Sequence, residues 1–283
     1  MVVRPHVPPE QLLGIARAAD ESGLEQLWLW EDSFYAGGIA SAAAALAATE
    51  RLRVGIGVMP VPYRNVALLA MEIAALDRMF PGRFIPGVGH GGQEWMGQAG
   101  VRVQSPMTLL REYVTALRAL LRGERVTVSG RYVNLDDVVL HWPPLTPPQV
   151  LIGATGPKSL RLCGEIADGS ILDARYRFDE IAGLRALIAE GHADRGDPHE
   201  TVAWLIAATG DGAHSRLAQE RIAWKQAPDS GVGVAGDAAD IAREIGEFVA
   251  IGVNSVAVVP TEDEPDLPGL ARLIATEVSS LVR

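Results

Sequence analysis

The sequence has 283 residues, 48% of them hydrophobic and 21% charged, which is enough for one large domain or two ordinary ones with a substantial core. The formal net charge is −10 and no cluster of Lys and Arg with interleaved aromatic residues occurs, so the composition excludes nucleic acid as an expected partner. No apolar run approaches the ~20 residues that cross a bilayer, and the first residues lack the apolar core of a signal peptide. With Cys163 as the single cysteine, no internal disulfide forms, and the sequence predicts a soluble cytoplasmic protein without a membrane partner.

Short apolar runs that are typical of buried strands alternate with helical patterns along the whole chain. A β-hairpin is expected over 126–140, where "VTVSGRYVNLDDVVL" alternates around a Ser-Gly turn. The strongest helical pattern covers 105–123, with Ser105 at the N-cap position and Gly123 just past the end. Its apolar stripe consists of Leu110, Val114, Leu117 and Leu121. The eight expected strands lie at 1–4, 24–30, 52–59, 82–89, 149–154, 169–174, 201–209 and 253–259.

Eight strand candidates, most of them followed by a helix, favour a (β/α)8 TIM barrel over a doubly wound sheet. A doubly wound sheet usually has fewer units and an early Gly-rich dinucleotide loop, whereas the first turn here, "RPHVPPE", contains no glycine. We therefore expect a single domain over 1–283, with the hairpin inserted after the fourth unit. In this fold the site lies where the strands end. Those ends are 5–6, 30–33, 57–60, 87–91, 154–158, 173–175, 209–211 and 259–260.

The segment "GATGPKS" begins the helix that is expected after the fifth strand. Gly156 allows close backbone approach, Pro157 suits the first helical position, and the free N–H groups of the first turn would point into the barrel mouth. Lys158 stands at the positive end of the helix dipole, where a bound phosphate would stabilise it. The alternative is that Gly-Pro only starts the helix and that Lys158 faces solvent.

Four segments, in this order along the chain, resemble the luciferase-like flavin and deazaflavin oxidoreductases. They are "LEQLWLWED", "RVGIGVMPVPYRNVALLAMEIAALDRMFPGR", "GRFIPGVGHGGQEW" and "GPKSLRLCGEIADG", and the resemblance extends over about 9–259. The last segment resembles most the branch that uses the deazaflavin coenzyme F420, which includes methylene-tetrahydromethanopterin reductase and F420-dependent glucose-6-phosphate dehydrogenase. The branch of bacterial luciferase uses FMN instead.

The resemblance implies that the ring of coenzyme F420, or alternatively of FMN, lies across the barrel mouth. A non-prolyl cis peptide at the end of the third strand would support the ring, and by position it joins Gly57 and Val58. Without the resemblance, Gly57 would be interpreted as a packing glycine of a barrel strand. The fourth strand and its loop would pass beneath the cofactor through Gly87, Gly89, His90 and Gly91, with His90 either contacting the cofactor or capping the loop. The cofactor phosphate would be bound by Ala154, Thr155, Gly156, Pro157 and Lys158.

In the family the cofactor transfers a hydride, while the protein orients the substrate and supplies a proton. The family's sugar-phosphate and alcohol dehydrogenases carry an Asp-His pair after the second strand, whereas this chain has Asp32 followed by Ser33. A serine without a partner base cannot take an alcohol proton near neutral pH, so alcohol oxidation is disfavoured. We expect Asp32 near the polar edge of the ring or the substrate, and His6 or Glu94 as the proton donor. The alternative for each of the three is a solvated loop residue.

The favoured function is therefore reduction of a C=C, C=N or methylene-pterin-like bond in a small organic substrate. The alternatives are an FMN-dependent monooxygenase of the same fold, a cofactor-binding protein without turnover, and an unrelated TIM-barrel enzyme that binds a phosphorylated substrate at 155–158. The histidines show no ligand spacing, so no metal site is expected. The resemblance also implies a homodimer through the early helices. The candidates for the substrate pocket are Trp30, Ser33, Tyr63, Trp95 and Arg175.

Overall fold

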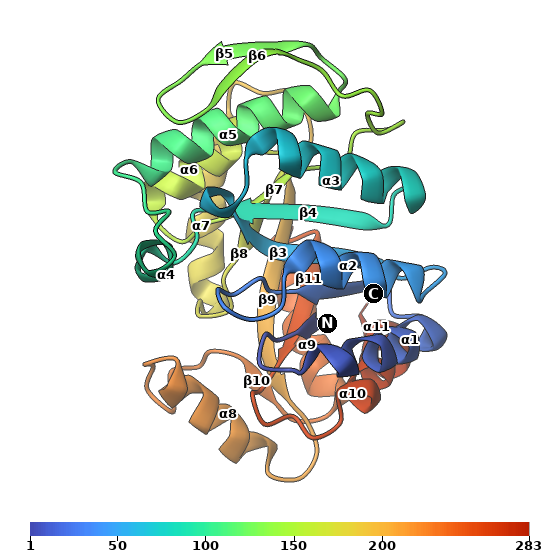
Figure 1. Cartoon of the computed structure of the whole chain (residues 1–283). Helices are drawn as coiled ribbons and strands as arrows, with labels where there is room; N and C mark the ends of the chain where they lie inside the picture. Colours follow the sequence, from blue (N-terminus) through green and yellow to red (C-terminus); the bar gives the residue numbers. More distant parts are fainter. Residues whose placement is uncertain (283) are drawn as a thin grey trace.

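A computed structural model describes residues 1–282, in which parallel strands alternate with helices (Figure 1). The strands of the parallel sheet are β1 (Val2–Val3), β2 (Gln26–Leu29), β3 (Arg53–Pro60), β4 (Phe84–Gly89), β7 (Leu151–Gly153), β8 (Gly169–Leu172), β9 (Glu200–Ala208), β10 (Val234–Ala235) and β11 (Ser255–Pro260). The α-helices are α1 (Leu12–Ser22), α2 (Gly38–Ala47), α3 (Val66–Met79), α4 (Gln93–Gln98), α5 (Pro106–Leu121), α6 (Pro157–Ile166), α7 (Phe178–His192), α8 (Ala213–Ala223), α9 (Ala238–Ala250), α10 (Leu267–Leu273) and α11 (Ser279–Leu281).

The parallel sheet curls, so that its last strand in the sequence lies against its first. Strands pair in the order β1-β2-β3-β4-β7-β8-β9, and β11 pairs with β9 from Ser255 opposite Val202 to Pro260 opposite Ala207. On its other side β11 packs against β1 and β2, and the Ser255 hydroxyl donates a hydrogen bond to Gln26 Oε1 over 3.4 Å. The short β10 pairs only with the last two residues of β9. All strands of this sheet are parallel, so their carboxyl ends share one edge of it.

Two further strands, β5 (Val126–Ser129) and β6 (Asn134–Val138), pair antiparallel between α5 and β7 in the chain. The turn that joins them is fixed by Glu112 of α5. Its carboxylate accepts hydrogen bonds from the backbone N–H groups of Arg131, Tyr132 and Val133 over 2.8–3.0 Å. A single side chain thus satisfies three turn donors that no strand partner could reach.

The helix expected over 105–123 is α5, and both of its ends are confirmed in position, although the Ser105 side chain makes no capping hydrogen bond. Ser105 is the N-cap, and Gly123 adopts a φ of +77° after the last turn. The expected apolar stripe is buried along its whole length. It consists of Leu110, Val114, Leu117 and Leu121. Within residues 1–282, no helix has both the length and the apolar character that a transmembrane span requires.

Tryptophans fill the space inside the curled sheet, and they explain several glycines. Trp28 and Trp204 meet edge to face with ring centroids 5.0 Å apart. A Cβ atom at Gly55 would lie 2.3 Å from the Trp28 ring, and one at Gly57 would lie 2.6 Å from the Trp204 ring. Strand β3 therefore has glycine at its inward positions because large side chains from β2 and β9 occupy that volume.

Candidate active site

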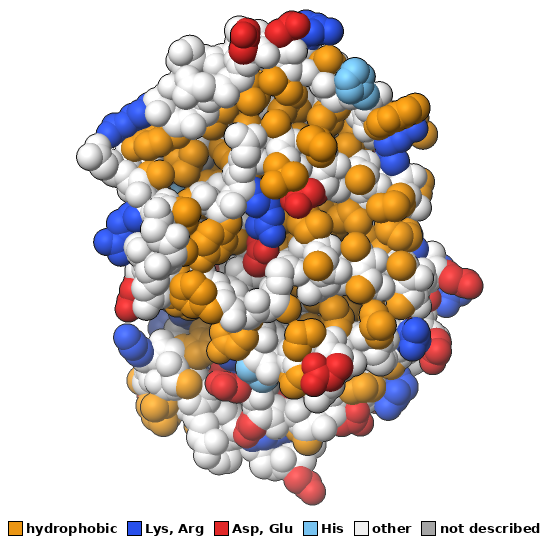
Figure 2. All heavy atoms as spheres, in the orientation of Figure 1, with side chains coloured by type: hydrophobic (Ala, Val, Ile, Leu, Met, Phe, Trp, Pro, Cys, Tyr) orange, Lys and Arg blue, Asp and Glu red, His pale blue; other side chains and the backbone are white. Residues whose placement is uncertain are grey.

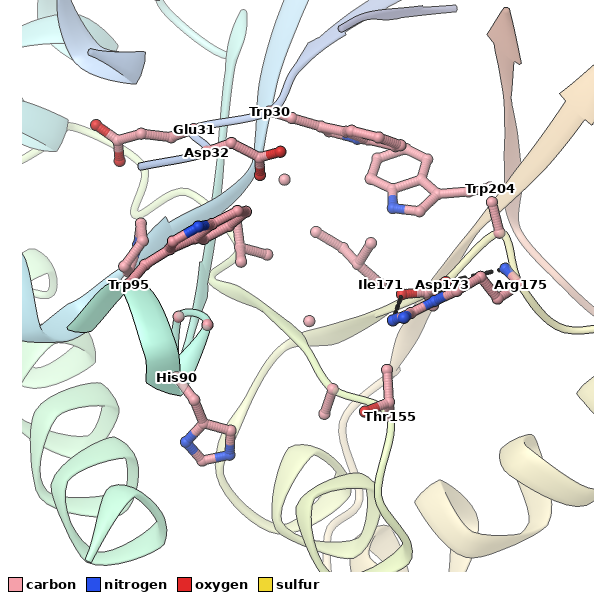
Figure 3. Close-up of a pocket in the computed structure, with 18 of the residues that line it drawn as sticks. Trp30, Glu31, Asp32, His90, Trp95, Thr155, Ile171, Asp173, Arg175 and Trp204 are labelled. Carbon is pink, nitrogen blue, oxygen red and sulfur yellow. Dashed lines mark hydrogen bonds and ion pairs between the residues drawn. The ribbon is translucent and has the colours of Figure 1, made fainter. Parts of the chain in front are cut away.

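A cavity of about 690 Å³ opens where the parallel strands end (Figure 3). Residues that follow β2, β4, β7 and β8 line it, together with the end of β3, Trp204 of β9 and the last turn of α8. A volume in this range, bordered by loops from several strand ends, is typical of a site for a small organic molecule.

The floor of the cavity includes the backbone of β3 at Gly57, which has no side chain. Gly57 and Val58 line the cavity, and the peptide bond between them is cis, at the position that the family resemblance implied. The register between β3 and β4 shifts at the same place, between Ile56 and Met59. Because Trp204 leaves no room for a Cβ at Gly57, the backbone itself forms this part of the surface.

Aromatic rings form two sides of the cavity. Trp30 lies beside Trp204 with ring centroids 6.4 Å apart, and beside Trp224 with centroids 6.2 Å apart. Figure 3 shows Trp30 and Trp204 together on one side, with Trp95 of α4 on another. Flat apolar walls of this kind accommodate a planar conjugated ligand.

Two carboxylates from the end of β2 line the cavity, and only one of them is free to act on a ligand. Glu31 accepts hydrogen bonds from Gly38 N over 2.9 Å and from both terminal nitrogens of Arg64 over 2.8 and 2.5 Å. Asp32 points into the cavity (Figure 3), and its carboxylate has no hydrogen-bond partner among residues 1–282. Burial raises the pKa of Asp32, and the nearby guanidinium of Arg4 opposes that rise.

The N-terminus of α6 lies at the edge of the cavity. Thr155 and Ser159 line the cavity on either side of it, and the N-cap residue Gly156 offers no side-chain cap to the first-turn N–H groups. Such N–H groups attract an anion. His90 lines the cavity and its Nε2 lies 3.2 Å from Ser159 Oγ, while burial lowers the pKa of His90, which favours the neutral ring.

Many of the residues that the sequence singled out meet in this cavity. Ala154, Thr155, Asp32, His90 and the floor residues lie around it. The predicted residues that line it are Trp30, Asp32, Gly57, Val58, His90, Gly91, Trp95, Ala154, Thr155 and Arg175.

The other predicted residues lie outside the lining. His6, Glu94 and Lys158 are exposed, and Gly156 and Pro157 begin α6 just beyond the cavity edge. Ser33 and Tyr63 are hydrogen-bonded to each other over 2.6 Å, away from the cavity.

Gly87 and Gly89 belong to β4 and do not line the cavity either. A Cβ atom at Gly87 would lie 2.4 Å from the carbonyl oxygen of Ile56, and one at Gly89 would lie 2.8 Å from a methyl group of Val58. In this structure these two glycines serve the contact between β3 and β4.

Sequence reasoning missed Arg4 and the wall formed by Trp204, Trp224 and Lys225. Trp204 has a readable signal, since it alternates with Val202 and Ile206 along β9 and all three belong to the inner cluster. Trp224 and Lys225 line the cavity because of where α8 packs, and no local sequence pattern predicts that position. Within residues 1–282, no cluster of His, Cys, Asp and Glu is arranged to hold a metal ion.

Comparisons with known proteins point to one family. The profile of the luciferase-like monooxygenase family matches residues 2–210. The chain is 30% identical over 198 residues to 5,10-methylenetetrahydromethanopterin reductase of Methanolobus tindarius, a match that covers 69% of this chain and 60% of that protein. It is 33% identical over 178 residues to F420-dependent glucose-6-phosphate dehydrogenase of Nakamurella multipartita, covering 58% of this chain and 52% of that protein. The matched segments thus span little more than half of these relatives' lengths.

Solved structures give the same fold. The coenzyme F420 dependent tetrahydromethanopterin reductase from Methanopyrus kandleri matches with a TM-score of 0.84 at 20% identity, over 100% of this chain and 98% of that one. At this identity the likeness concerns the fold alone, an α/β fold with a curled parallel sheet. The family profile, by contrast, covers well over half of the sequence and every strand from β1 to β9. This chain therefore belongs to the luciferase-like monooxygenase family.

Proposed function

We propose that this protein is an oxidoreductase that uses coenzyme F420 to reduce a C=C, C=N or methylene-pterin-like bond in a small organic substrate. The observation that carries the proposal is the cavity itself, in which a backbone floor at Gly57 and Val58 lies between aromatic walls and an uncapped helix N-terminus. One of the two relatives described above is named as a 5,10-methylenetetrahydromethanopterin reductase. The name of the other states that it depends on F420. The cavity fits the ring and phosphate of either cofactor, and the F420-dependent relative favours F420 over FMN, which remains the alternative cofactor.

In the proposed architecture the sheet closes into a (β/α)8 barrel, with β1, β2, β3, β4, β7, β8, β9 and β11 as its strands. The packing of β11 against β1 supports closure, and the β5–β6 hairpin would be the insertion after the fourth unit. We treat the chain over 1–283 as one domain. Every strand end would then face the same cavity, which supports a single active site.

The residues of the cavity fit the proposed cofactor. A tricyclic ring needs a flat surface without side chains, and the floor at Gly57 provides one because no Cβ is present there. A phosphate needs N–H donors, and the first turn of α6 with Thr155 and Ser159 provides them. When bound in its reduced form, F420 supplies a hydride from C5 of its ring. Thr155, Gly156 and Lys158 would hold the phosphate, with Lys158 at the solvent side.

Asp32 is proposed to hold the proton that the reduced substrate needs. Its carboxyl faces the cavity and burial raises its pKa, so the protonated form persists to higher pH than in a solvated Asp. His6 and Glu94 are less suited, because both are exposed and outside the lining. His90, in its neutral form, would contribute to cofactor binding through its contact with Ser159.

The same geometry favours a reductase over an alcohol dehydrogenase. Ser33, at the position of the family's base, is buried and hydrogen-bonded to the Tyr63 hydroxyl, so it has no basic partner. When one carbon of a C=C or C=N bond accepts the hydride, a carboxylic acid near the substrate can donate a proton to the other atom of that bond.

We also propose a cytoplasmic homodimer. Figure 2 shows hydrophobic side chains gathered over the surface where α2 and α3 lie, and Leu68 and Met71 of α3 are 47% and 58% exposed. Burying such a patch against a second copy would remove it from water. Size-exclusion chromatography with light scattering tests this, and a monomer at micromolar concentration would contradict it.

Equilibrium dialysis of the purified protein against F420 and against FMN tests the cofactor. We expect saturable binding of F420 at micromolar concentration and none of FMN. The reduced, loaded protein is then assayed with an enone, an imine and a secondary alcohol. Selective binding of FMN would favour the monooxygenase, and binding of F420 without reduction of any acceptor would favour a cofactor-binding protein.

A further inference from the structure

We propose that Lys225, just past the end of α8, binds an acidic group on the substrate, so that the site selects a planar conjugated acceptor carrying one carboxylate. The inference rests on the proposed function, because Lys225 belongs to the wall of the same cavity. It assigns a substrate class to a site whose substrate the sequence left open.

Lys225 has a left-handed backbone, which it shares among non-glycine residues of 1–282 with Phe34 and Asp137, but it lies at a helix end where two other helices have glycine. Lys225 has a φ of +60°, and it follows the C-cap residue of α8. Helices α5 and α9 end in the same way, but with Gly123 at +77° and Gly252 at +83° in the equivalent position. Left-handed backbone disfavours side chains with a Cβ, so glycine is the usual residue there.

The hydrogen bonds of these three helix ends are also equivalent. After α8, Lys225 N donates to Ile222 O and Gln226 N donates to Arg221 O, over 2.9 and 2.8 Å. After α5 and α9 the corresponding backbone pairs form over 2.8–3.1 Å. A lysine therefore occupies a glycine position without changing the motif, and the exception motivates a role for its side chain.

A buried ion pair in the last turn of α8, a part-buried one near its start and a cross-link after its end hold α8 in place. Arg4 donates to Glu220 over 2.7 Å, and Arg216 donates to Glu264 over 3.0 Å. Gln226 Nε2 donates to the carbonyl of Arg175 over 2.7 Å, which ties the segment to the loop after β8. The position of the Lys225 backbone relative to the cavity is thereby fixed, although α8 lies at the periphery of the fold in Figure 1.

Lys225 is the cation of the lining that has no carboxylate partner within residues 1–282. Arg175, also in the lining, is paired with Asp173 over 2.8 and 2.6 Å. Lys225 forms no ion pair, and its neighbour Trp224 continues the aromatic wall of Trp30. An aromatic wall ending in one free ammonium matches a flat, apolar molecule with one acidic group.

The test uses 4-carboxybenzylideneacetone and its methyl ester, which share a conjugated body and differ by one negative charge. Isothermal titration calorimetry measures the binding of each to the protein alone and to the protein loaded with oxidised F420. We expect the acid to bind about three- to tenfold more tightly than the ester. The difference should shrink as the salt concentration rises.

Lys225→Gly is a variant that removes the ammonium and gives the backbone the residue it favours, so it should fold at least as well as the parent. We expect it to bind acid and ester equally, with the ester unchanged, and Lys225→Arg to keep the preference. Equal binding of acid and ester by the parent, a preference that survives in Lys225→Gly, or no binding of either probe would each overturn the inference. If F420 fails to bind while the parent still prefers the acid in a Lys225-dependent way, the proposed cofactor fails and the subsite stands.

Discussion

Replacing Glu220 by Gln should destabilise the protein far more than the same change at a surface ion pair. Glu220 and its partner Arg4 are buried, with side chains 3% and 9% exposed, and Glu220 also accepts a hydrogen bond from Glu262 N over 2.7 Å. Removing the Glu220 charge leaves Arg4 buried without its hydrogen-bonded counter-charge, which costs about 3–5 kcal/mol. At about 2–4 °C per kcal/mol for a large domain, the melting temperature should fall by roughly 6–20 °C.

The matched control is Glu165→Gln, which breaks the exposed pair between Arg111 of α5 and Glu165 of α6. Both side chains there are about half exposed, at 48% and 51%, so the loss should stay below about 1 kcal/mol. Urea and thermal unfolding measure both variants. The double variant Arg4→Met with Glu220→Gln should lose less than the sum of the two single losses. If Glu220→Gln proves as mild as Glu165→Gln, the reasoning from burial is refuted.

Three further predictions concern the floor, the carboxyl group and the thiol. Gly57→Ala should destabilise the fold by about 1–3 kcal/mol in urea unfolding, because its Cβ would lie 2.6 Å from Trp204. It should also weaken cofactor binding in dialysis. An unchanged unfolding midpoint would contradict this prediction. Because the folded-state pKa of Asp32 is raised, its stability penalty is absent below the ordinary pKa, grows as pH rises from that value, and is complete above the folded pKa. Asp32→Asn should therefore raise the melting temperature at pH 7 but not at pH 3. Its turnover should fall at least about tenfold in steady-state assays. A variant that is less stable than the parent at pH 7, or as active as the parent, would speak against this reasoning. Burial raises the pKa of the Cys163 thiol to about 12, so a thiol reagent at pH 8 should label it only after unfolding, and rapid labelling of the native protein would show the burial to be wrong.

Local signals carried most of the fold. The α5 boundaries follow from Pro106 at the first helical position and Gly123 just past the end, and the buried stripe follows from its spacing. The strand ends gave the outline of the cavity for the same reason, since parallel strands place their carboxyl ends at one edge. Asp32, Trp30 and Thr155 were found in this way.

What sequence reasoning could not give depends on contacts between distant segments. The hydrogen bond that turns Ser33 towards Tyr63 joins two loops, and the position of Lys225 depends on pairs between α8 and the ends of β1 and β11. Glycine was ambiguous as well. Gly57 forms the cavity floor and also accommodates Trp204, whereas Gly87 does not line the cavity and makes room for Ile56 of β3 and Ile171 of β8. The residue type is the same at both positions.

The tryptophans that fill the curled sheet give the protein a built-in optical reporter. Trp28 is shielded from solvent, and its ring contacts the ring of Trp204. Trp204 and Trp30 lie side by side and border the cavity. Indole emission overlaps the absorption of flavin-like rings, so any such ring seated on the β3 floor would take up excitation energy from all three. Occupancy of the cavity could thus be read from the quenching of near-ultraviolet emission, without a label and before any substrate is known.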